Sequence, residues 1–423
     1  MTRFGAAVQK IDERIPGVDL PLMSVSQTKG VVRRSELTDA PQRAESLDAY
    51  KVCRKGDVVF NKMKIRSGAM GVAHEDGLVT YHYEVLRPRE GMNPRYIVHL
   101  MKSSWFTSEL IARERGISAG GEHGGIRTTE VPFTVLRTID VLLPEIHEQR
   151  AIADYLDRET ARIDTLIEEQ QKLVKMLHMR RRAVVDAALS QGLDSEAGLS
   201  ETGNPWIPEL PCGWKAVRAK RVLVFGPANG VSPLAGDSDD LKSLSLGAIR
   251  DGRVSMAPEV TKFVDRSSLA STEALRLHPG DILLVRGNGN VDLVARAGLV
   301  GPEFAAEEYI YPDLLIRIRV SSSMLSEFFV WACNASATRA QVQAQARTAV
   351  GTFKVSGGDV RSLVLPLPPM HEQRAIVAHL DEQTSKIDSL ITESERFIDL
   401  ARERRSALIT ATVTGQIDVR ELV

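Results

Sequence analysis

The chain has 423 residues, of which 43% are hydrophobic and 26% are charged, and its formal net charge is −1. The length predicts two or three domains, and the composition is typical of a globular protein. The charge excludes a uniformly basic nucleic-acid coat, but it leaves room for a locally basic surface. Neither a run of eighteen apolar residues nor an apolar leader is present, and the three cysteines lie far apart, so we expect a reduced, cytoplasmic setting without membrane insertion.

The first part of the chain predicts a mixture of short strands and helices. GDVVFNKM (56–63) and YHYEVLRP (81–88) are predicted strands, the first entered through a Gly-Asp turn. PRYIVHLMKSSWFTSELIARERG (94–116) is a predicted helical segment. Basic residues gather in one short span, namely Lys51, Arg54, Lys55, Lys62, Lys64 and Arg66. This part is therefore predicted to be α+β with a locally basic surface.

A long helix is predicted next, because residues 145–191 contain neither glycine nor proline. Residues 370–414 have the same property and predict a second long helix. Apolar residues recur at coiled-coil spacing in both. In the first helix the predicted seam is Ile163, Leu166, Leu173, Leu177 and Val184, with Gln170 and Arg180 in the remaining core slots; in the second it is Ile387, Leu390, Phe397, Ala401 and Leu408. Two helices with one apolar seam each are expected to pack on each other, antiparallel.

The six letters HEQRAI stand at 147–152 and again at 371–376, so the two copies are 224 residues apart. The same offset relates Gly56-Asp57 to Gly280-Asp281. Strand-like runs also recur in the second half, as PGDILLVR (279–286) and YPDLLIRIRV (311–320), followed by a helical segment at 322–346. A period this long indicates duplication of a whole module. We therefore predict two homologous α+β domains separated by two long antiparallel coiled-coil helices, with an intramolecular pseudo-two-fold.

The repeated segments resemble a known family. LPEIHEQRAIADYLDRETARIDTLIEEQ and its second copy LPPMHEQRAIVAHLDEQTSKIDSLITESE are similar to the conserved regions of the DNA-specificity subunits of Type I restriction–modification systems. LPCGWKAV resembles the usual opening of the second target-recognition domain, and GDVVFNKM, GAMGV and DGLVTYHYEVLRP resemble stretches of the first. The first copy lacks a counterpart of Gly213-Trp214, so either its first strand is short or the start is late.

The resemblance implies an order of segments, a role and a set of partners. The expected segments are a first target-recognition domain at 1–143, a central conserved helical region at 144–203, a second target-recognition domain at 204–367 and a C-terminal conserved helical region at 368–423. Each domain would recognise one half of a bipartite double-stranded DNA target, with the helices as spacer. Two modification (methyltransferase) subunits would carry S-adenosylmethionine, and two restriction (nuclease and translocase) subunits using ATP and Mg would add to them.

Motifs for catalysis are absent from the sequence. We find neither a G-x-x-x-x-G-K-[ST] phosphate loop nor the Asn/Asp-Pro-Pro-Tyr/Phe tetrapeptide of an amino-methyltransferase. Gly287-Asn288-Gly289-Asn290 is interpreted as a loop, and the repeated His-Glu pairs as polar helix starts rather than metal ligands. The chain is thus expected to be non-catalytic, without metal or cofactor of its own. The alternatives are a self-sufficient DNA methyltransferase or nuclease, and a coiled-coil scaffold without sequence preference.

DNA recognition needs basic side chains for phosphates and a few side chains that contact base edges, with arginine suited to guanine and asparagine to adenine. The predicted DNA-binding residues of the first domain are Lys62, Lys64, Arg66, Ser67, His123 and Arg127. Those of the second are Arg286, Asn288, Asn290, Arg347, Thr348 and Lys354. For any single residue, a solvated loop position or a phosphate contact is the commoner role. The predicted subunit-assembly residues are His147, Glu148, Gln149, Arg150, His371, Glu372, Gln373 and Arg374.

Overall fold

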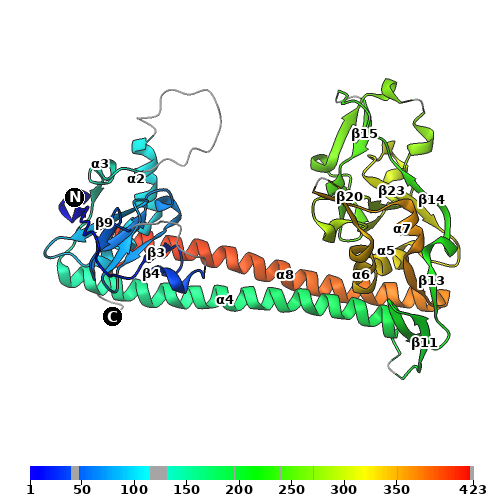
Figure 1. Cartoon of the computed structure of the whole chain (residues 1–423), viewed down its shortest axis with the longest axis horizontal. Coiled ribbons are helices and arrows are strands. Elements are labelled where there is room, and N and C mark those ends of the chain that lie inside the picture. Colours follow the sequence, from blue (N-terminus) through cyan, green and yellow to red (C-terminus); the bar gives the residue numbers. More distant parts are fainter. Residues whose placement is uncertain are drawn as a thin grey trace. The chain divides into compact units, whose positions relative to one another are not determined.

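A computed structural model describes residues 1–39, 47–114, 131–194, 196–237, 240–269, 271–349 and 351–419. Two compact units are present: unit 1 comprises Met1–Lys172 with Ser394–Val423, and unit 2 comprises Leu173–Glu393. The long helices α4 (Ile146–Gln191) and α8 (Met370–Val413) each contribute to both units (Figure 1). The units thus cut across the four predicted segments, whose boundaries stay a prediction.

Unit 1 is built on a four-stranded antiparallel sheet in the order β2-β9-β6-β7. Its strands are β2 (Val8–Ile11), β6 (Val58–Asn61), β7 (Met70–Val72) and β9 (Tyr83–Pro88). Three strand pairs join it: β1 (Thr2–Arg3) with β10 (Asp140–Val141), β3 (Met23–Ser26) with β4 (Gly30–Arg33), and β5 (Lys51–Cys53) with β8 (Gly77–Val79). The helices are α1 (Pro94–Lys102), α2 (Ser104–Glu114) and α3 (Phe133–Leu136), and α1 packs on β6 and β7.

Unit 2 contains a larger set of sheets. A six-stranded sheet has the order β14-β23-β19-β21-β17-β16, and its strands are β14 (Leu223–Asn229), β16 (Ile249–Arg250), β17 (Arg253–Val254), β19 (Ile282–Val285), β21 (Ala297–Leu299) and β23 (Leu315–Val320). One three-stranded sheet joins β15 (Leu241–Leu244), β18 (Thr261–Val264) and β22 (Tyr309–Ile310); another joins β20 (Gly287–Asn288), β24 (Arg347–Ala349) and β25 (Thr352–Lys354). The strand pairs are β11 (Leu199–Asn204) with β12 (Ile207–Pro211) and β13 (Lys215–Arg218) with β26 (Val364–Leu367). The short helices are α5 (Ser326–Asn334), α6 (Ser336–Gln345) and α7 (Gly357–Ser362).

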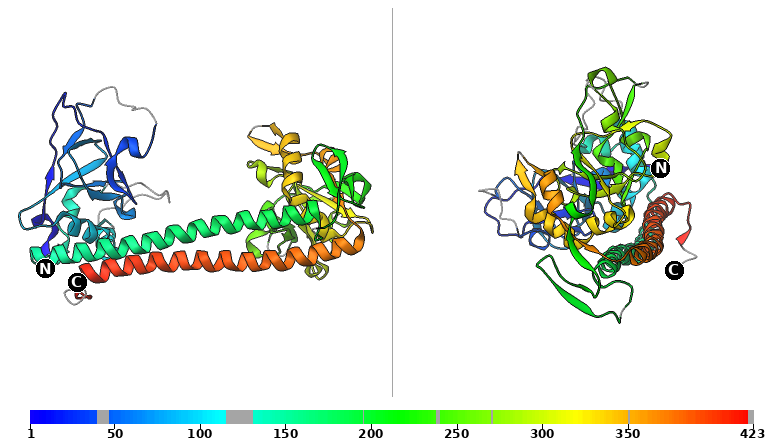
Figure 2. Two further views of the ribbon diagram at one scale, coloured as in Figure 1. Left: turned by 90° about the horizontal axis from the view of Figure 1, so that it is seen from below. Right: turned by 90° about the vertical axis from the view of Figure 1, so that its right-hand side faces the viewer.

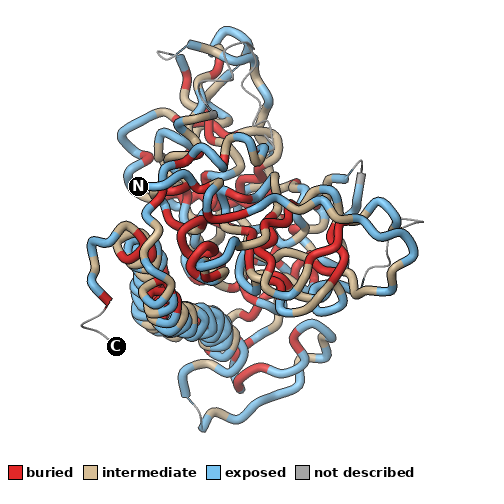
Figure 3. Tube along the Cα trace, turned by 90° about the vertical axis from the view of Figure 1, so that its left-hand side faces the viewer, coloured by how far each residue is buried: buried red, intermediate tan, exposed pale blue. Residues whose placement is uncertain are grey.

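The predicted mixture of strands and helices is confirmed. The two Gly-Asp runs form β6 and β19, which lie inside their sheets with nearly every residue buried, as expected for continuous apolar runs. The first strand of unit 1 is short, because β1 pairs two residues with β10 whereas β13 pairs four with β26. Buried positions gather in the strands and short helices of each unit, while most positions of the long helices are exposed or half-buried (Figure 3).

The long helices run antiparallel, as predicted. In unit 1 the Arg405 guanidinium binds the Asp164 carboxylate with two hydrogen bonds of 2.8 and 3.1 Å. In unit 2 Arg181 binds Asp388 in the same way, at 2.8 and 3.2 Å. The two residue numbers of each pair add up to 569, so both units use one helix register. Figures 1 and 2 show the two helices side by side in both units.

The predicted seam is correct only in part. Ile163, Leu177 and Ile387 are buried, and Leu177 packs against Ile387. However, four other predicted seam residues are exposed, with exposed fractions of 45% for Leu166, 37% for Leu173, 48% for Leu390 and 43% for Phe397. Two helices cover only a narrow stripe of each other, and this stripe also takes in Ile391 and Ile398. The apolar pattern of the sequence is therefore wider than one helix pair buries.

Candidate nucleic-acid interface

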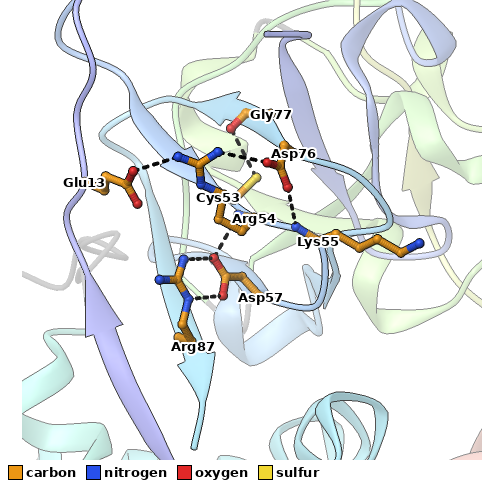
Figure 4. A network of polar contacts seen from close by, with 8 residues as sticks. All are labelled: Glu13, Cys53, Arg54, Lys55, Asp57, Asp76, Gly77 and Arg87. Carbon is orange, nitrogen blue, oxygen red and sulfur yellow. Dashed lines mark hydrogen bonds and ion pairs between the residues drawn. The ribbon is translucent and has the colours of Figure 1, made fainter. Parts of the chain in front are cut away.

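The Gly-Asp turn of unit 1 is fixed by a buried carboxylate. Asp57 accepts two hydrogen bonds of 2.9 Å from the Arg87 guanidinium on β9 and one of 2.8 Å from the backbone N–H of Arg54 (Figure 4). The hydrogen bonds that Arg87 donates to Asp57 raise the pKa of the Arg87 guanidinium above its ordinary value. Arg54 in turn binds Glu13 and Asp76, at 2.8 and 2.9 Å. This network sets the start of β6, and hence the place of the loop that follows it.

Unit 2 has the same arrangement. Asp281 is fully buried, binds the guanidinium of Arg319 on β23, and accepts a hydrogen bond of 2.9 Å from the backbone N–H of His278. Arg317 lies 3.7 Å from the same carboxylate. The sequence predicted both aspartates as turn residues. Their pairing with an arginine on a neighbouring strand was missed, because the partner is far away along the chain.

The loop after β6 carries four of the predicted DNA-binding residues. Lys62 is half-buried, whereas Lys64, Arg66 and Ser67 are exposed. The Ser67 hydroxyl donates to the backbone oxygen of Lys64 at 3.0 Å, within the 3-10 turn η3 (Ile65–Ser67). Gly68 follows in the left-handed conformation (φ 77°), which a glycine adopts without strain. The loop is thus shaped by its own backbone and presents three polar side chains to solvent.

Two residues that sequence reasoning missed lie beside this loop. The backbone N–H of Lys62 donates to the backbone oxygen of His82 at 3.0 Å, which joins the loop to the segment before β9. Tyr81 is 59% exposed and its ring centre lies 3.9 Å from that of His82. The predicted strand at 81–88 was too long, because β9 begins only at Tyr83. An exposed tyrosine next to lysines suits contact with bases and phosphates.

The remaining two candidates of the first domain, His123 and Arg127, lie outside the described residues.

In unit 2 the structure brings all six predicted DNA-binding residues to one small sheet. Arg286 directly precedes β20, whose residues Gly287 and Asn288 pair with Lys354 and Phe353 on β25. On the other side of β25, Lys354 pairs with Arg347 and Phe353 with Thr348 on β24. Asn290 follows β20. Two separate stretches of sequence thus meet in the sheet β20-β25-β24.

These six residues differ in whether their side chains already form hydrogen bonds within the protein. Arg286 donates from Nη1 to the backbone oxygen of Asp313 at 3.2 Å, and its guanidinium lies 4.0 Å from the Asp313 carboxylate. Asn288 accepts from the backbone N–H of Asn290 through Oδ1 at 2.9 Å. Asn290 likewise accepts from the N–H of Asp292 at 2.9 Å and is the N-cap of η9 (Val291–Leu293). Arg347, Thr348 and Lys354 are exposed.

The predicted assembly residues separate into an inner and an outer set. Gln149 and Gln373 are fully buried, which corrects their assignment to a surface. Gln149 accepts from the N–H of Asn93 at 2.9 Å and donates to the oxygen of Pro144 at 2.8 Å. Gln373 makes the matching contacts with the N–H of Leu325 and the oxygen of Pro368, at 2.8 and 2.9 Å. Both glutamines therefore fasten the loop before a short helix to the start of a long one.

For the outer set, the role in subunit assembly stays a prediction. His147, Arg150, His371 and Arg374 are exposed, and Glu148 and Glu372 are half-buried. Glu372 accepts a hydrogen bond of 2.8 Å from the indole N–H of Trp214. Across the part of the chain that the structure describes, three or more His, Cys, Asp or Glu side chains are nowhere grouped to hold a metal ion. Within the same residues, the structure contains no helix that is both long and apolar enough to span a membrane.

Known proteins with similar sequences are specificity subunits of Type I restriction enzymes. No family model matches the chain. The specificity subunit of the Type I restriction enzyme EcoKI from Escherichia coli is 24% identical over 334 residues, which cover 79% of this chain and 68% of that protein. The StySPI specificity subunit from Salmonella potsdam is 22% identical over 78% of this chain and 67% of its own length. The putative MjaX specificity subunit from Methanocaldococcus jannaschii is 21% identical over 86% and 79%.

Solved structures have the same fold. A chain from a study of complex assembly and conformational transition of the type I R-M system matches with a TM-score of 0.71, 17% identity, and coverage of 98% of this chain and 97% of that one. The HsdS subunit from Thermoanaerobacter tengcongensis matches with a TM-score of 0.52 and 18% identity, over 98% and 96%. Sequence and fold comparisons thus agree, and they confirm that this chain is similar, over most of its length, to the specificity subunits of Type I restriction–modification systems.

Proposed function

We propose that this chain is the DNA sequence-specificity subunit of a Type I restriction–modification enzyme. Its two units recognise the two halves of a bipartite target, and α4 and α8 act as the spacer. The observation that carries the proposal is the sheet β20-β25-β24, where predicted DNA-binding residues from two separate stretches of sequence meet, among them the exposed basic side chains of Arg347 and Lys354. Arginine and lysine bind phosphates there, and arginine can also bind base edges.

The two units present different donors, which supports a target of two unlike halves. Unit 1 offers a loop with Lys64, Arg66 and Ser67 beside the exposed ring of Tyr81. Unit 2 offers a sheet with Arg347 and Lys354. Base pairs differ in the donors and acceptors that they expose in the major groove, so surfaces of different chemistry select different sequences.

Partner subunits supply the chemistry in this proposal. The chain itself is non-catalytic, and two modification subunits hold S-adenosylmethionine, while restriction subunits use ATP and Mg in the cytoplasm. The long helices offer a surface for assembly, because they expose apolar side chains that a globular chain usually buries. These are Leu166, Leu173 and Met176 on α4, and Leu390, Phe397 and Leu400 on α8. The second set follows the first at the 224-residue offset, so two equivalent partners are expected.

Genome-wide mapping of methylated adenine, with and without the gene for this chain, tests the proposal. We expect a methylated sequence of two defined halves and an unspecified gap, which disappears when the gene is deleted and returns when it is restored. The purified chain alone should transfer no methyl group from labelled S-adenosylmethionine to DNA. An unchanged methylation pattern after deletion, or methyl transfer by the chain alone, would contradict the proposal.

A further inference from the structure

The strand register of β20-β25-β24 sorts its side chains onto two faces. Residues that pair across antiparallel strands point to the same face, and successive residues alternate. Arg347 and Lys354 pair and therefore share a face, to which Thr352 also belongs because it pairs with Ala349. Thr348 and Phe353 share the opposite face. Asn288 lies on that opposite face as well, because it pairs with Phe353 on the other side of β25.

One of the two faces is turned toward the interior at Phe353 and Asn288, whereas its third residue, Thr348 on the edge strand, is exposed. Phe353 packs against the hydrophobic core of unit 2. Asn288, which is half-buried, flanks that side chain. The face with Arg347 and Lys354 is therefore the outer one, and both of these side chains are exposed. A Cβ atom built on Gly287 would lie 3.1 Å from Cγ of Lys354, so the glycine leaves room for the lysine stem to cross β20.

The side chains of Asn288 and Asn290 form hydrogen bonds with the backbone of their own loop. Oδ1 of Asn288 accepts the N–H of Asn290, and Oδ1 of Asn290 accepts the N–H of Asp292. A bidentate contact with adenine needs the oxygen and the nitrogen of the amide to face the base edge together, whereas each of these oxygens is turned toward a backbone N–H of its own loop and held there. By contrast, neither Arg347 nor Lys354 has a hydrogen bond or ion pair from its side chain to another described residue.

We propose that the outer face of β24 and β25, with Arg347, Thr352 and Lys354, is the DNA-contacting surface of unit 2, and that Asn288 and Asn290 act only by shaping the adjoining loop. A two-stranded ribbon has the width to enter the major groove, and β24 is the edge strand of its sheet. This inference rests on the proposed function and assigns its specificity-determining residues.

The experiment uses the complete modification complex and a duplex that contains the methylated sequence found in the genome. Binding is measured over a range of salt concentrations, with single base changes in each half of the target. Arg347→Ala and Lys354→Ala should each reduce discrimination in one half about ten- to hundred-fold or, where the contact is to phosphate, lower the slope of log affinity against log salt by about one. The other half should be recognised as before.

Two control substitutions make the result decisive. Asn290→Ser keeps an N-cap oxygen and should leave recognition unchanged, because serine caps a helix about as well as asparagine. Arg221→Ala removes another exposed arginine of unit 2 and should also have no effect. The inference is overturned if Asn290→Ser alters the recognised half, or if Arg347→Ala and Lys354→Ala both behave like Arg221→Ala. A complete complex without any sequence preference would instead refute the proposed function, and this inference with it.

Discussion

Asp57 and Asp281 are the residues on which the geometry of the loops after β6 and β19 depends most directly. A carboxylate removed from water needs a charged partner and several hydrogen bonds, and each of the two finds both in an arginine on a neighbouring strand and a backbone N–H. The loops after β6 and β19 begin only a few residues later. Loss of either carboxylate therefore weakens the support of the loop that follows without changing the side chains of that loop.

Substitution Asp57→Asn tests this role. The side chain keeps its size but loses its charge, and with it the charged hydrogen bonds to Arg87. We expect unit 1 to lose about 1.5–3 kcal/mol of unfolding free energy, measured by urea unfolding. Asp19→Asn, at an exposed position, is the matched control and should change the stability by less than about 0.5 kcal/mol. Equal stability of the two variants would refute the anchoring role.

Residue roles were predicted from the sequence only where the partner was local. The Gly-Asp turns were predicted from their own residues. The arginines that bind the aspartates lie on neighbouring strands, and the sequence does not show which strands pair. The same limit explains Gln149. Its burial depends on the backbone of Asn93, which only the packing of α1 on α4 brings near.

At the scale of elements, two Asp–Arg pairs align the antiparallel helices. Each pair has bidentate geometry and is half-buried. Such pairs contribute modestly to stability but penalise any other alignment, because a shifted helix would leave the charges unpaired. They set the register that the apolar seam alone specifies only loosely.

Charge reversal tests the pair in unit 2. Arg181→Asp places a carboxylate next to Asp388 and should lower the stability of unit 2 by about 1 kcal/mol. Arg181→Asp combined with Asp388→Arg should recover most of that loss, as followed by thermal unfolding. Arg182→Asp reverses a neighbouring exposed charge and serves as the control. A double variant no more stable than Arg181→Asp would show that the pair does not fix the register.

The sequence predicted the long helices well, because their length, their lack of glycine and proline and their periodicity are all local properties. It predicted their seam less well. Periodicity identifies apolar positions but not what covers them, so Leu166 and Leu390 were assigned to the seam although both are exposed. The sequence also could not predict which candidate residues share a face of the sheet β20-β25-β24. A shift of one residue in strand register moves every side chain to the opposite face.

For the whole molecule, the proposed function makes the length of the helix pair a determinant of the DNA target. Seven residues, about two helical turns, can be removed from each helix at facing positions of the antiparallel register, residues 170–176 and 393–399. This shortens each helix by about 10 Å, or roughly three base pairs of duplex. We expect the unspecified gap to shrink by about that amount while both half-sites stay the same.

Methylation mapping of the shortened chain measures the outcome directly. A control chain in which the same two stretches are replaced by other helix-forming residues of equal length should keep the original gap. Altered half-sites with an unchanged gap would mean that the helices do not act as a spacer.

The contacts of Gln149 and Gln373 have one more consequence. Both amides bind main-chain atoms, namely an N–H before a short helix and a carbonyl before a long one, and neither of these contacts uses the identity of a side chain. These two glutamine contacts therefore do not depend on the side chains of their partners, although Trp214 and Glu372 add a side-chain contact beside Gln373. If the proposed function holds, we expect that a different α+β fold can replace either unit's own at this joint, provided that its loop offers a backbone N–H to the glutamine.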